Sequence, residues 1–265
     1  MSAARSEYLM AGQASELERL QLQSRVWEPS AEALLDRIGA PRRAVDIGCG
    51  ALGWLRVLSR RVGPEGTVVG TDIDDRLLDS ARAFVERERL ANVELVRDDL
   101  FDSRLPAASF DLVHARFQLA PLGRADAQLA TYRRLVANGG VIALEDPDTS
   151  SWRFHPRSAA AERLIGLIRE AFRAAGGDLD AGVADVDALR GLGVEPEMRA
   201  HVEALPPGHP YLRLPLQFAT SMRPRLLALV PSSELDALAA EVERDLARPG
   251  VWGTTFTLVQ TWARF

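Results

Sequence analysis

Residues 44–53, AVDIGCGALG, constrain the fold of this chain more than any other stretch of its sequence. An apolar run that carries one acid, Asp46, breaks into three glycines, Gly48, Gly50 and Gly53. This pattern predicts a buried strand that ends in a tight turn and opens a helix, because glycine tolerates positive φ and lets a ligand approach the main chain. The spacing fits the G-x-G-x-x-G fingerprint, so it indicates a nucleotide-like ligand without choosing which one. A plain glycine-rich turn is the alternative.

Strands and helices alternate along the first half of the chain. The predicted strands are residues 43–47, 67–72, 93–99, 110–116 and 141–146, and the helices between them are residues 51–62, 74–89 and 123–137. The strands are nearly continuous apolar runs, which is typical of a parallel sheet covered by helices on both faces. The sequence therefore predicts an α/β fold.

The two flanks of this region read differently. Residues 5–38 look helical, and Pro29 is expected to divide this segment into helices at 14–26 and 30–38. Beyond residue 146 the predicted elements are helices at 157–175, 183–191, 216–229 and 232–247, a strand at 194–204, and a closing strand at 254–264. A proline-rich stretch, residues 206–215, interrupts the alternation.

Composition excludes several kinds of function. The net charge of −5 argues against a non-specific nucleic-acid binder, which needs clustered positive charge. All 32 basic residues are arginine, which excludes Schiff-base chemistry, a P-loop lysine and a Tyr-x-x-x-Lys dehydrogenase pair. The first ten residues lack the apolar core of a signal peptide, and no stretch has membrane-spanning length. We therefore expect a cytoplasmic protein with no membrane partner.

Two acidic positions favour an adenosine ligand. Asp72 ends the second predicted strand, where a carboxylate can accept both ribose hydroxyls of either a nicotinamide or an S-adenosylmethionine (SAM) cofactor. Asp98, Asp99 and Leu100 follow the third strand, where an acid can accept from an adenine amino group. Dinucleotide enzymes more often carry small residues after the third strand, so the acids at 98 and 99 favour SAM over a nicotinamide cofactor.

Five motifs in order carry a resemblance to a known family. They are VDIGCGALG (45–53), VVGTDID (68–74), VRDDL (96–100), FDLVHAR (110–116) and RLVANGG (134–140). With them the chain resembles the class I SAM-dependent methyltransferases, in the group that includes ubiquinone/menaquinone-type and natural-product enzymes. The resemblance implies a Rossmann-like seven-stranded sheet in the order 3-2-1-4-5-7-6, with strand seven antiparallel. It also implies an N-terminal helical lid (1–40), a SAM-binding core (41–205), a helical insertion (206–250) and a last core strand (251–265).

The resemblance also assigns the cofactor, SAM, with S-adenosylhomocysteine as the product. The methionine moiety would face Asp46 and the glycine loop, Asp72 would take the ribose, Ile73 would pack on the adenine, and Arg116 would lie near the methionine tail. The full set implied for the cofactor is Tyr8, Asp46, Gly48, Cys49, Gly50, Gly53, Asp72, Ile73, Asp98, Asp99, Leu100 and Arg116. Tyr8 and residues 16–20 resemble lid helices of this group, although simple packing onto the sheet is as good an interpretation.

Four residues are candidate bases, and a base is needed only if the acceptor must lose a proton. Glu145 and Asp146 end the fifth strand, His155 precedes a helix, and His114 lies inside the fourth strand. Either acid has other possible roles, as an anchor for a cationic acceptor or as a helix cap, and a packed histidine is the favoured interpretation of His114. No set of His, Asp and Glu has metal-ligand spacing, so we expect no metal.

The acceptor pocket is expected from the lid and the insertion, and its apolar character suits a small aromatic, terpenoid or polyketide-like acceptor. The candidate substrate-binding residues are Phe117, Trp152, Phe154, Tyr211, Phe218 and Met222, and for each of them a core position is the alternative. The predicted function is methyl transfer to a small molecule by a monomer or homodimer. The alternatives are a SAM-binding protein with non-methylating, pericyclase-like chemistry and a non-catalytic scaffold. An NAD-linked dehydrogenase is disfavoured by the third and fourth motifs and the missing lysine.

Overall fold

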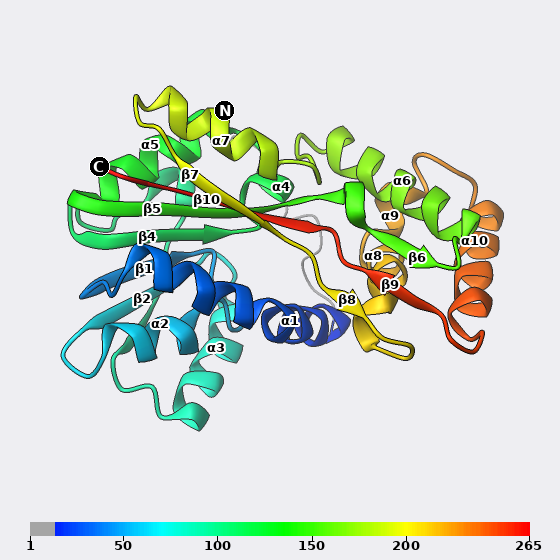
Figure 1. Cartoon of the computed structure of the whole chain (residues 1–265), viewed down its shortest axis with the longest axis horizontal. Helices are drawn as coiled ribbons and strands as arrows, with labels where there is room; N and C mark the ends of the chain where they lie inside the picture. Colours follow the sequence, from blue (N-terminus) through cyan, green and yellow to red (C-terminus); the bar gives the residue numbers. More distant parts are fainter. Residues whose placement is uncertain (1–13) are drawn as a thin grey trace.

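A seven-stranded sheet forms one half of the structure, as Figure 1 shows. The computed structural model describes residues 14–265, with side chains from Arg19 onward. In spatial order the strands are β3 (Val93–Arg97), β2 (Thr67–Asp72), β1 (Arg43–Ile47), β4 (Phe110–Arg116), β5 (Val136–Asp148), β10 (Thr257–Arg264) and β7 (Glu197–His201). The first five strands are parallel, and β10 runs antiparallel to both of its neighbours. The predicted strand order and the antiparallel strand seven are therefore confirmed.

Strand register aligns the polar residues of the sheet interior. Asp46 on β1 pairs with His114 on β4, and Glu145 on β5 pairs with Gln260 on β10. Side chains two residues apart share a face of a strand. Arg116 on β4 pairs with Glu145 on β5, and His114 is two residues before Arg116. The side chains of His114 and Glu145 therefore lie on the same face of the sheet, on neighbouring strands. Buried polar groups from four different segments thus meet in one region of the sheet.

Helices cover both faces of the sheet, as the alternation of apolar side chains requires. Ala44 contributes to the core beneath one group of helices, and the next residue, Val45, contributes to the core beneath the other. The first group is α1 (Ala14–Ile38), α2 (Leu55–Val62) and α3 (Asp75–Glu88). The second is α5 (Ala125–Leu135) and α7 (Gly182–Gly191), and the short α4 (Leu119–Leu122) follows β4.

A separate group of helices lies beyond the arrowhead of β4, on the side towards which the parallel strands point (Figure 1). It consists of α6 (Ala159–Ala174), the 3₁₀ turn η3 (Pro210–Arg213), α8 (Leu214–Ser221), α9 (Arg223–Leu226) and α10 (Ser232–Leu246). A three-stranded sheet, β6 (Arg153–His155), β9 (Trp252–Thr254) and β8 (Ala204–Leu205), belongs to the same half. Two further 3₁₀ turns are η1 (Leu100–Asp102) and η2 (Thr149–Ser151). We call this half, residues 149–182 and 202–256, the helical half.

Helix α1 joins the two halves. Its Trp27 is fully buried in the core of the helical half, while its Leu34 is fully buried in the core beneath the sheet. The predicted break at Pro29 is wrong, because α1 continues through this proline. Burial on both sides of Pro29 holds the helix together although proline removes one backbone hydrogen bond.

Other differences from the predicted elements are local. The predicted helix at 216–229 is two helices, α8 and α9, each with a proline in its first turn, where a missing N–H is tolerated. The predicted strand at 194–204 is divided between β7 and β8, and the one at 254–264 between β9 and β10. In both cases the two strands belong to different sheets. The helix predicted from residue 51 begins at Leu55, because residues 51–54 form turns.

Candidate functional site

The glycine loop after β1 is folded tightly around Asp46. Gly48, Gly50 and Gly53 have φ of +65°, +56° and +41°, a region that L side chains rarely adopt. A Cβ atom on Gly53 would lie 2.0 Å from Asp46 Oδ2, and that same oxygen accepts a hydrogen bond of 2.7 Å from the backbone N–H of Trp54. Only glycine fits at position 53 while Asp46 keeps this bond.

Asp72 joins the glycine loop to the end of β2. Its Oδ2 accepts from the N–H of Gly50 at 2.9 Å, and its Oδ1 accepts from the N–H of Asp74 at 2.9 Å. Burial raises the pKa of Asp72, and the N–H donors partly oppose this. The neighbouring Ile73 is 47% exposed at the same strand end. The structure therefore brings together the first two predicted cofactor motifs.

The third motif lies beside the second. The N–H of Asp98 donates to the backbone carbonyl of Asp72 at 3.1 Å. The carboxylate of Asp98 accepts from the N–H of Arg104, and that of Asp99 caps η1 by accepting from the N–H of Phe101, each at 2.9 Å. The strand end thus presents Asp72 together with Asp99, which is exposed. Leu100, which is partly buried, continues the same turn.

Beneath the loop, His114 is held between two carboxylates. Its Nδ1 lies 2.8 Å from Asp46 Oδ1 and its Nε2 lies 3.4 Å from Glu145 Oε2. The ring stacks on Trp54 with 3.6 Å between centroids. Burial lowers the pKa of His114, but the bonds to Asp46 and Glu145 raise it more, so the pKa lies above its usual value. A protonated imidazole then balances part of the negative charge.

Arg116 and Gln260 complete this network. Arg116 Nε lies 3.9 Å from Glu145 Oε2, and Gln260 Nε2 donates to the other Glu145 oxygen, Oε1. Arg116 Nη2 also donates to Ser24 Oγ at 3.2 Å and to the carbonyl of Gly53 at 3.5 Å. Arg116 therefore ties helix α1 to the glycine loop.

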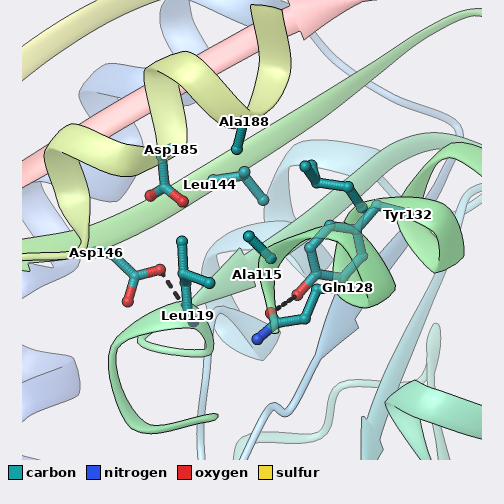
Figure 2. A pocket seen from close by; sticks show the side chains of 10 residues that line it. Ala115, Leu119, Gln128, Tyr132, Leu144, Asp146, Asp185 and Ala188 are labelled. Atoms are coloured by element: carbon teal, nitrogen blue, oxygen red, sulfur yellow. Dashed lines mark hydrogen bonds between the residues drawn. The ribbon is translucent and has the colours of Figure 1, made fainter. Parts of the chain in front are cut away.

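Asp146 belongs to a different site from its neighbour Glu145, because successive residues of a strand point to opposite faces. It accepts from the N–H groups of Leu119 and Ala120 at 3.3 and 2.8 Å, which fixes the turn after β4. Asp146 and Asp185, the latter on α7, both line a cavity of about 10 Å³ (Figure 2). Both oxygens of Asp185 are buried without a hydrogen-bond partner in the part of the chain that the structure describes.

Burial governs the ionisation of this acid pair. It raises the pKa of Asp146 to about 7, with a further contribution from Glu145. It raises the pKa of Asp185 well above its ordinary value, and the charge of Asp146 adds to this effect. A cavity of this size holds about one water molecule. Burial therefore favours the protonated, neutral form of both carboxyl groups.

Of the four candidate bases, His114 and Glu145 contact each other, whereas Asp146 and His155 lie elsewhere. His114, Glu145 and Asp146 are each at most 2% exposed and contact protein groups. His155 lies on β6 in the second sheet, where its ring stacks on Trp252 with 4.3 Å between centroids. Burial raises the pKa of the Cys49 thiol well above its usual value, so this cysteine stays protonated. Tyr8 lies outside the described residues.

The predicted acceptor residues share one core with Trp27. Rings of Trp152 and Phe218 lie 6.1 Å apart, and Trp27 Nε1 donates to Tyr211 Oη at 3.3 Å. Phe117, whose φ is +56°, contacts this core at the exit of β4. The members of the set that are buried in this core are Trp152, Phe154, Tyr211, Phe218 and Met222.

Three residues of these sites were not predicted from sequence: Trp54, Asp185 and Gln260. Gln260 carried a signal, since it is a polar residue within an apolar strand. Asp185 carried a weaker one, as an acid on the sheet-facing side of a short helix. Within residues 14–265, no cluster of His, Cys, Asp or Glu is arranged to hold a metal ion. None of the described helices combines the length and apolar character of a membrane span.

The family model and the relatives that match this chain are all described as methyltransferases. A family model described as a methyltransferase domain matches residues 44–140. Nocamycin O-methyltransferase of Saccharothrix syringae is 31% identical over 243 residues, which cover 86% of each chain. Aklanonic acid methyltransferase DauC of Streptomyces sp. (strain C5) is 35% identical over 105 residues, or 40% of this chain and 48% of the relative.

The fold has solved counterparts as well. The crystal structure of a SAM-dependent methyltransferase from Aquifex aeolicus superposes with a TM-score of 0.54 at 20% identity. The superposition covers 71% of this chain and 92% of that one. This likeness concerns the fold alone.

Proposed function

Because this chain belongs to the class I SAM-dependent methyltransferases, we propose that it binds SAM at the glycine loop and methylates a small, largely apolar acceptor. The hydrogen bond from the Gly50 N–H to Asp72 carries the proposal. It joins a half-buried carboxylate to a positive-φ backbone at the carboxyl ends of adjacent parallel strands, where open α/β sheets bind nucleotides.

The residues present fit this cofactor. Asp72 offers a carboxylate that can accept both ribose hydroxyls, and Ile73 offers an apolar surface for the adenine. Asp99 and Leu100 would read the edge of the adenine ring, and Arg116 would lie at the methionine end. SAM, when bound, would supply an electrophilic methyl group. The glycine loop with Gly48, Cys49, Gly50 and Gly53 would hold the methionine moiety, with Asp46 supporting the loop from below.

The acceptor is proposed from two observations. The helical half lies beyond the carboxyl ends of the parallel strands (Figure 1). Its core is rich in aromatic side chains, which favours an apolar partner. The relatives are named for nocamycin and aklanonic acid, both small molecules, which supports an acceptor of that class. Holding donor and acceptor in line supplies much of the rate, on the order of 7–11 kcal/mol in favourable cases. We assign His114, Glu145 and Asp146 to supporting the site, because they are enclosed by protein groups.

Calorimetric titration with SAM tests the proposal. The wild-type chain is expected to bind SAM and not NAD. Asp72→Asn is expected to weaken SAM binding about ten-fold or more, because an amide replaces an acceptor of two hydroxyl donors with a group that offers one acceptor oxygen. Asp79→Asn, an exposed acid on α3, is the matched control. Undetectable SAM binding by the wild type at millimolar ligand would refute the function, and unchanged affinity in Asp72→Asn would refute the role of Asp72.

A further inference from the structure

Arg19 of α1 is a buried cation without an anionic partner in the described chain. It is 2% exposed, and its Nη1 donates to the neutral Gln23 at 3.0 Å. Its Nε and Nη2 have no hydrogen-bond partner among the described residues. A buried guanidinium is strongly destabilising unless it is paired and hydrogen-bonded. This position therefore calls for an anion from outside the described protein groups.

The place of Arg19 is the boundary between the glycine loop and the helical half. The next residue, Leu20, faces the loop, since its Cδ1 lies 3.8 Å from the position of a Cβ on Gly50. Arg19 itself lies over Phe218, with 5.5 Å from its Cζ atom to the ring centroid. Leu20 thus lies beside the glycine loop, where the donor is proposed to bind, while Arg19 lies beside the helical half, where the acceptor is proposed to bind.

The pKa of the nearby Tyr211 is affected by the charges of two arginines in this region, Arg19 and Arg116. Burial raises its pKa to about 12, while its bond to Trp27 and the positive charges of Arg19 and Arg116 oppose this rise. Arg116 has Glu145 at 3.9 Å, whereas Arg19 has no carboxylate within 4.0 Å in the described chain. Of these two arginines, Arg19 is therefore the one without a carboxylate partner among the described residues.

We propose that Arg19 binds an anionic oxygen group of the acceptor, a carboxylate or an enolate, so that the acceptor is an acidic apolar molecule. This inference rests on the proposed function. Nε and Nη2 form one edge of the guanidinium, and neither has a hydrogen-bond partner among the described residues, which matches the two oxygens of a carboxylate. The aromatic ring of Phe218 beneath the guanidinium suits an acceptor whose remaining surface is apolar.

Equilibrium binding of a matched pair of probes tests this assignment. The probes are 1-naphthoate and its neutral analogue 1-naphthamide, titrated into protein saturated with S-adenosylhomocysteine. The wild type is expected to bind the carboxylate about ten-fold more tightly than the amide. Arg19→Gln is expected to bind both equally, and Arg19→Lys to keep part of the preference, because lysine retains the charge without the fork. Arg37→Gln, an exposed arginine at the end of the same helix, should retain the full preference.

The outcomes separate the inference from the function on which it rests. Circular dichroism establishes that each variant is folded, and SAM affinity is measured in parallel. Unchanged SAM affinity in Arg19→Gln, with loss of the carboxylate preference, supports the assignment. The wild type binding both probes equally, or neither, overturns it while SAM binding still supports methyl transfer. Loss of SAM affinity in Arg19→Gln with the preference intact also overturns it, since Arg19 would then serve the donor carboxylate.

Discussion

His114 shows how one buried side chain connects the strands beneath the glycine loop. Two buried carboxylates, Asp46 and Glu145, lie on either side of its ring, and Trp54 covers one ring face. An imidazolium at this point compensates charge that the interior would otherwise leave unpaired. Asp46 in turn accepts the Trp54 N–H that closes the glycine loop. The histidine therefore acts on the loop through Asp46.

His114→Gln is expected to destabilise the protein by about 3–5 kcal/mol, because among the described residues it leaves the buried Asp46 without a cation and leaves Glu145 with Arg116 alone. The folded pKa of His114 lies above its usual value, so its stabilising contribution is complete below about pH 6.5 and is lost as the pH rises through the folded pKa. Urea denaturation at pH 6 and pH 8 measures both effects. His155→Gln is the control, and equal unfolding midpoints for His114→Gln and the wild type at pH 6 would contradict the assignment.

At the scale of residues, sequence predicted what local pattern determines. Asp46 and Asp72 were identified because each occupies a fixed place at a strand end, and the structure brings Asp72 to the glycine loop. Gln260 was not predicted, because its partner Glu145 lies on a strand formed more than a hundred residues earlier. Arg19 was seen only as part of a helix, since its environment comes from residues around 211 and 218.

The glycine loop is the element on which the site depends most. It carries three residues with positive φ within six positions, and two of its backbone groups are tied to Asp72 and Arg116. Such a loop is rigid because each bond fixes a different part of its backbone. Its shape can therefore be disturbed by one methyl group.

Gly53→Ala is expected to lower SAM affinity and to destabilise the fold by about 1–3 kcal/mol, because the added Cβ would lie 2.0 Å from Asp46 Oδ2. Gly63→Ala is the matched control, since Gly63 also has positive φ (+71°) but has open space around its Cβ position. Calorimetry and thermal unfolding measure the two effects. A loss of SAM affinity in Gly63→Ala as large as in Gly53→Ala would show that the contact with Asp46 is irrelevant.

Element boundaries were predicted best where the pattern is local and repeated. The bounds of β1, β2 and β4 match the sequence prediction, because each is an apolar run closed by turn residues. The continuity of α1 through Pro29 was missed, because packing in two cores outweighs the local effect of proline. The three-stranded sheet was missed for a related reason: its strands have two or three residues each, too few for a periodic pattern.

For the whole molecule, the acid pair of Asp146 and Asp185 links global stability to pH. The pair lies where α7, β5 and the turn after β4 meet, so unfolding exposes both carboxyls to water (Figure 2). The folded pKa of Asp146, about 7, exceeds the value of about 3.9 in an unfolded chain. The folded state thus binds more protons between these values, and the contribution of this group to stability falls as the pH rises from about 4 to about 7.

Asp185→Asn is expected to raise stability at pH 8 and to flatten its decline between pH 5 and pH 8, because it removes one buried acid that has no hydrogen-bond partner in the described chain. Asp178→Asn, an exposed acid that pairs with Arg173, should leave the profile unchanged. Urea unfolding midpoints across this range provide the measurement. A lower midpoint for Asp185→Asn at pH 8 would show that the carboxylate itself stabilises the fold.

The overall arrangement was partly predictable. The order of the main sheet was implied by the family resemblance that the five motifs carry, and the structure confirms it. The packing of the helical half could not be predicted from the sequence, because its helices contact one another across segments with no regular spacing. Its core is assembled from residues between 152 and 258 together with Trp27 of α1.

The position of β10 has a consequence for how the chain acquires its shape. β10 comes after β7 in sequence but lies between β5 and β7 in the sheet. During synthesis β7 therefore has no neighbour to pair with until β10 emerges, and the edge of β5 stays open for that time. Such long-range pairing slows folding and exposes strand edges to other chains. The sheet can therefore be completed only once β10 is available to fill the gap between β5 and β7.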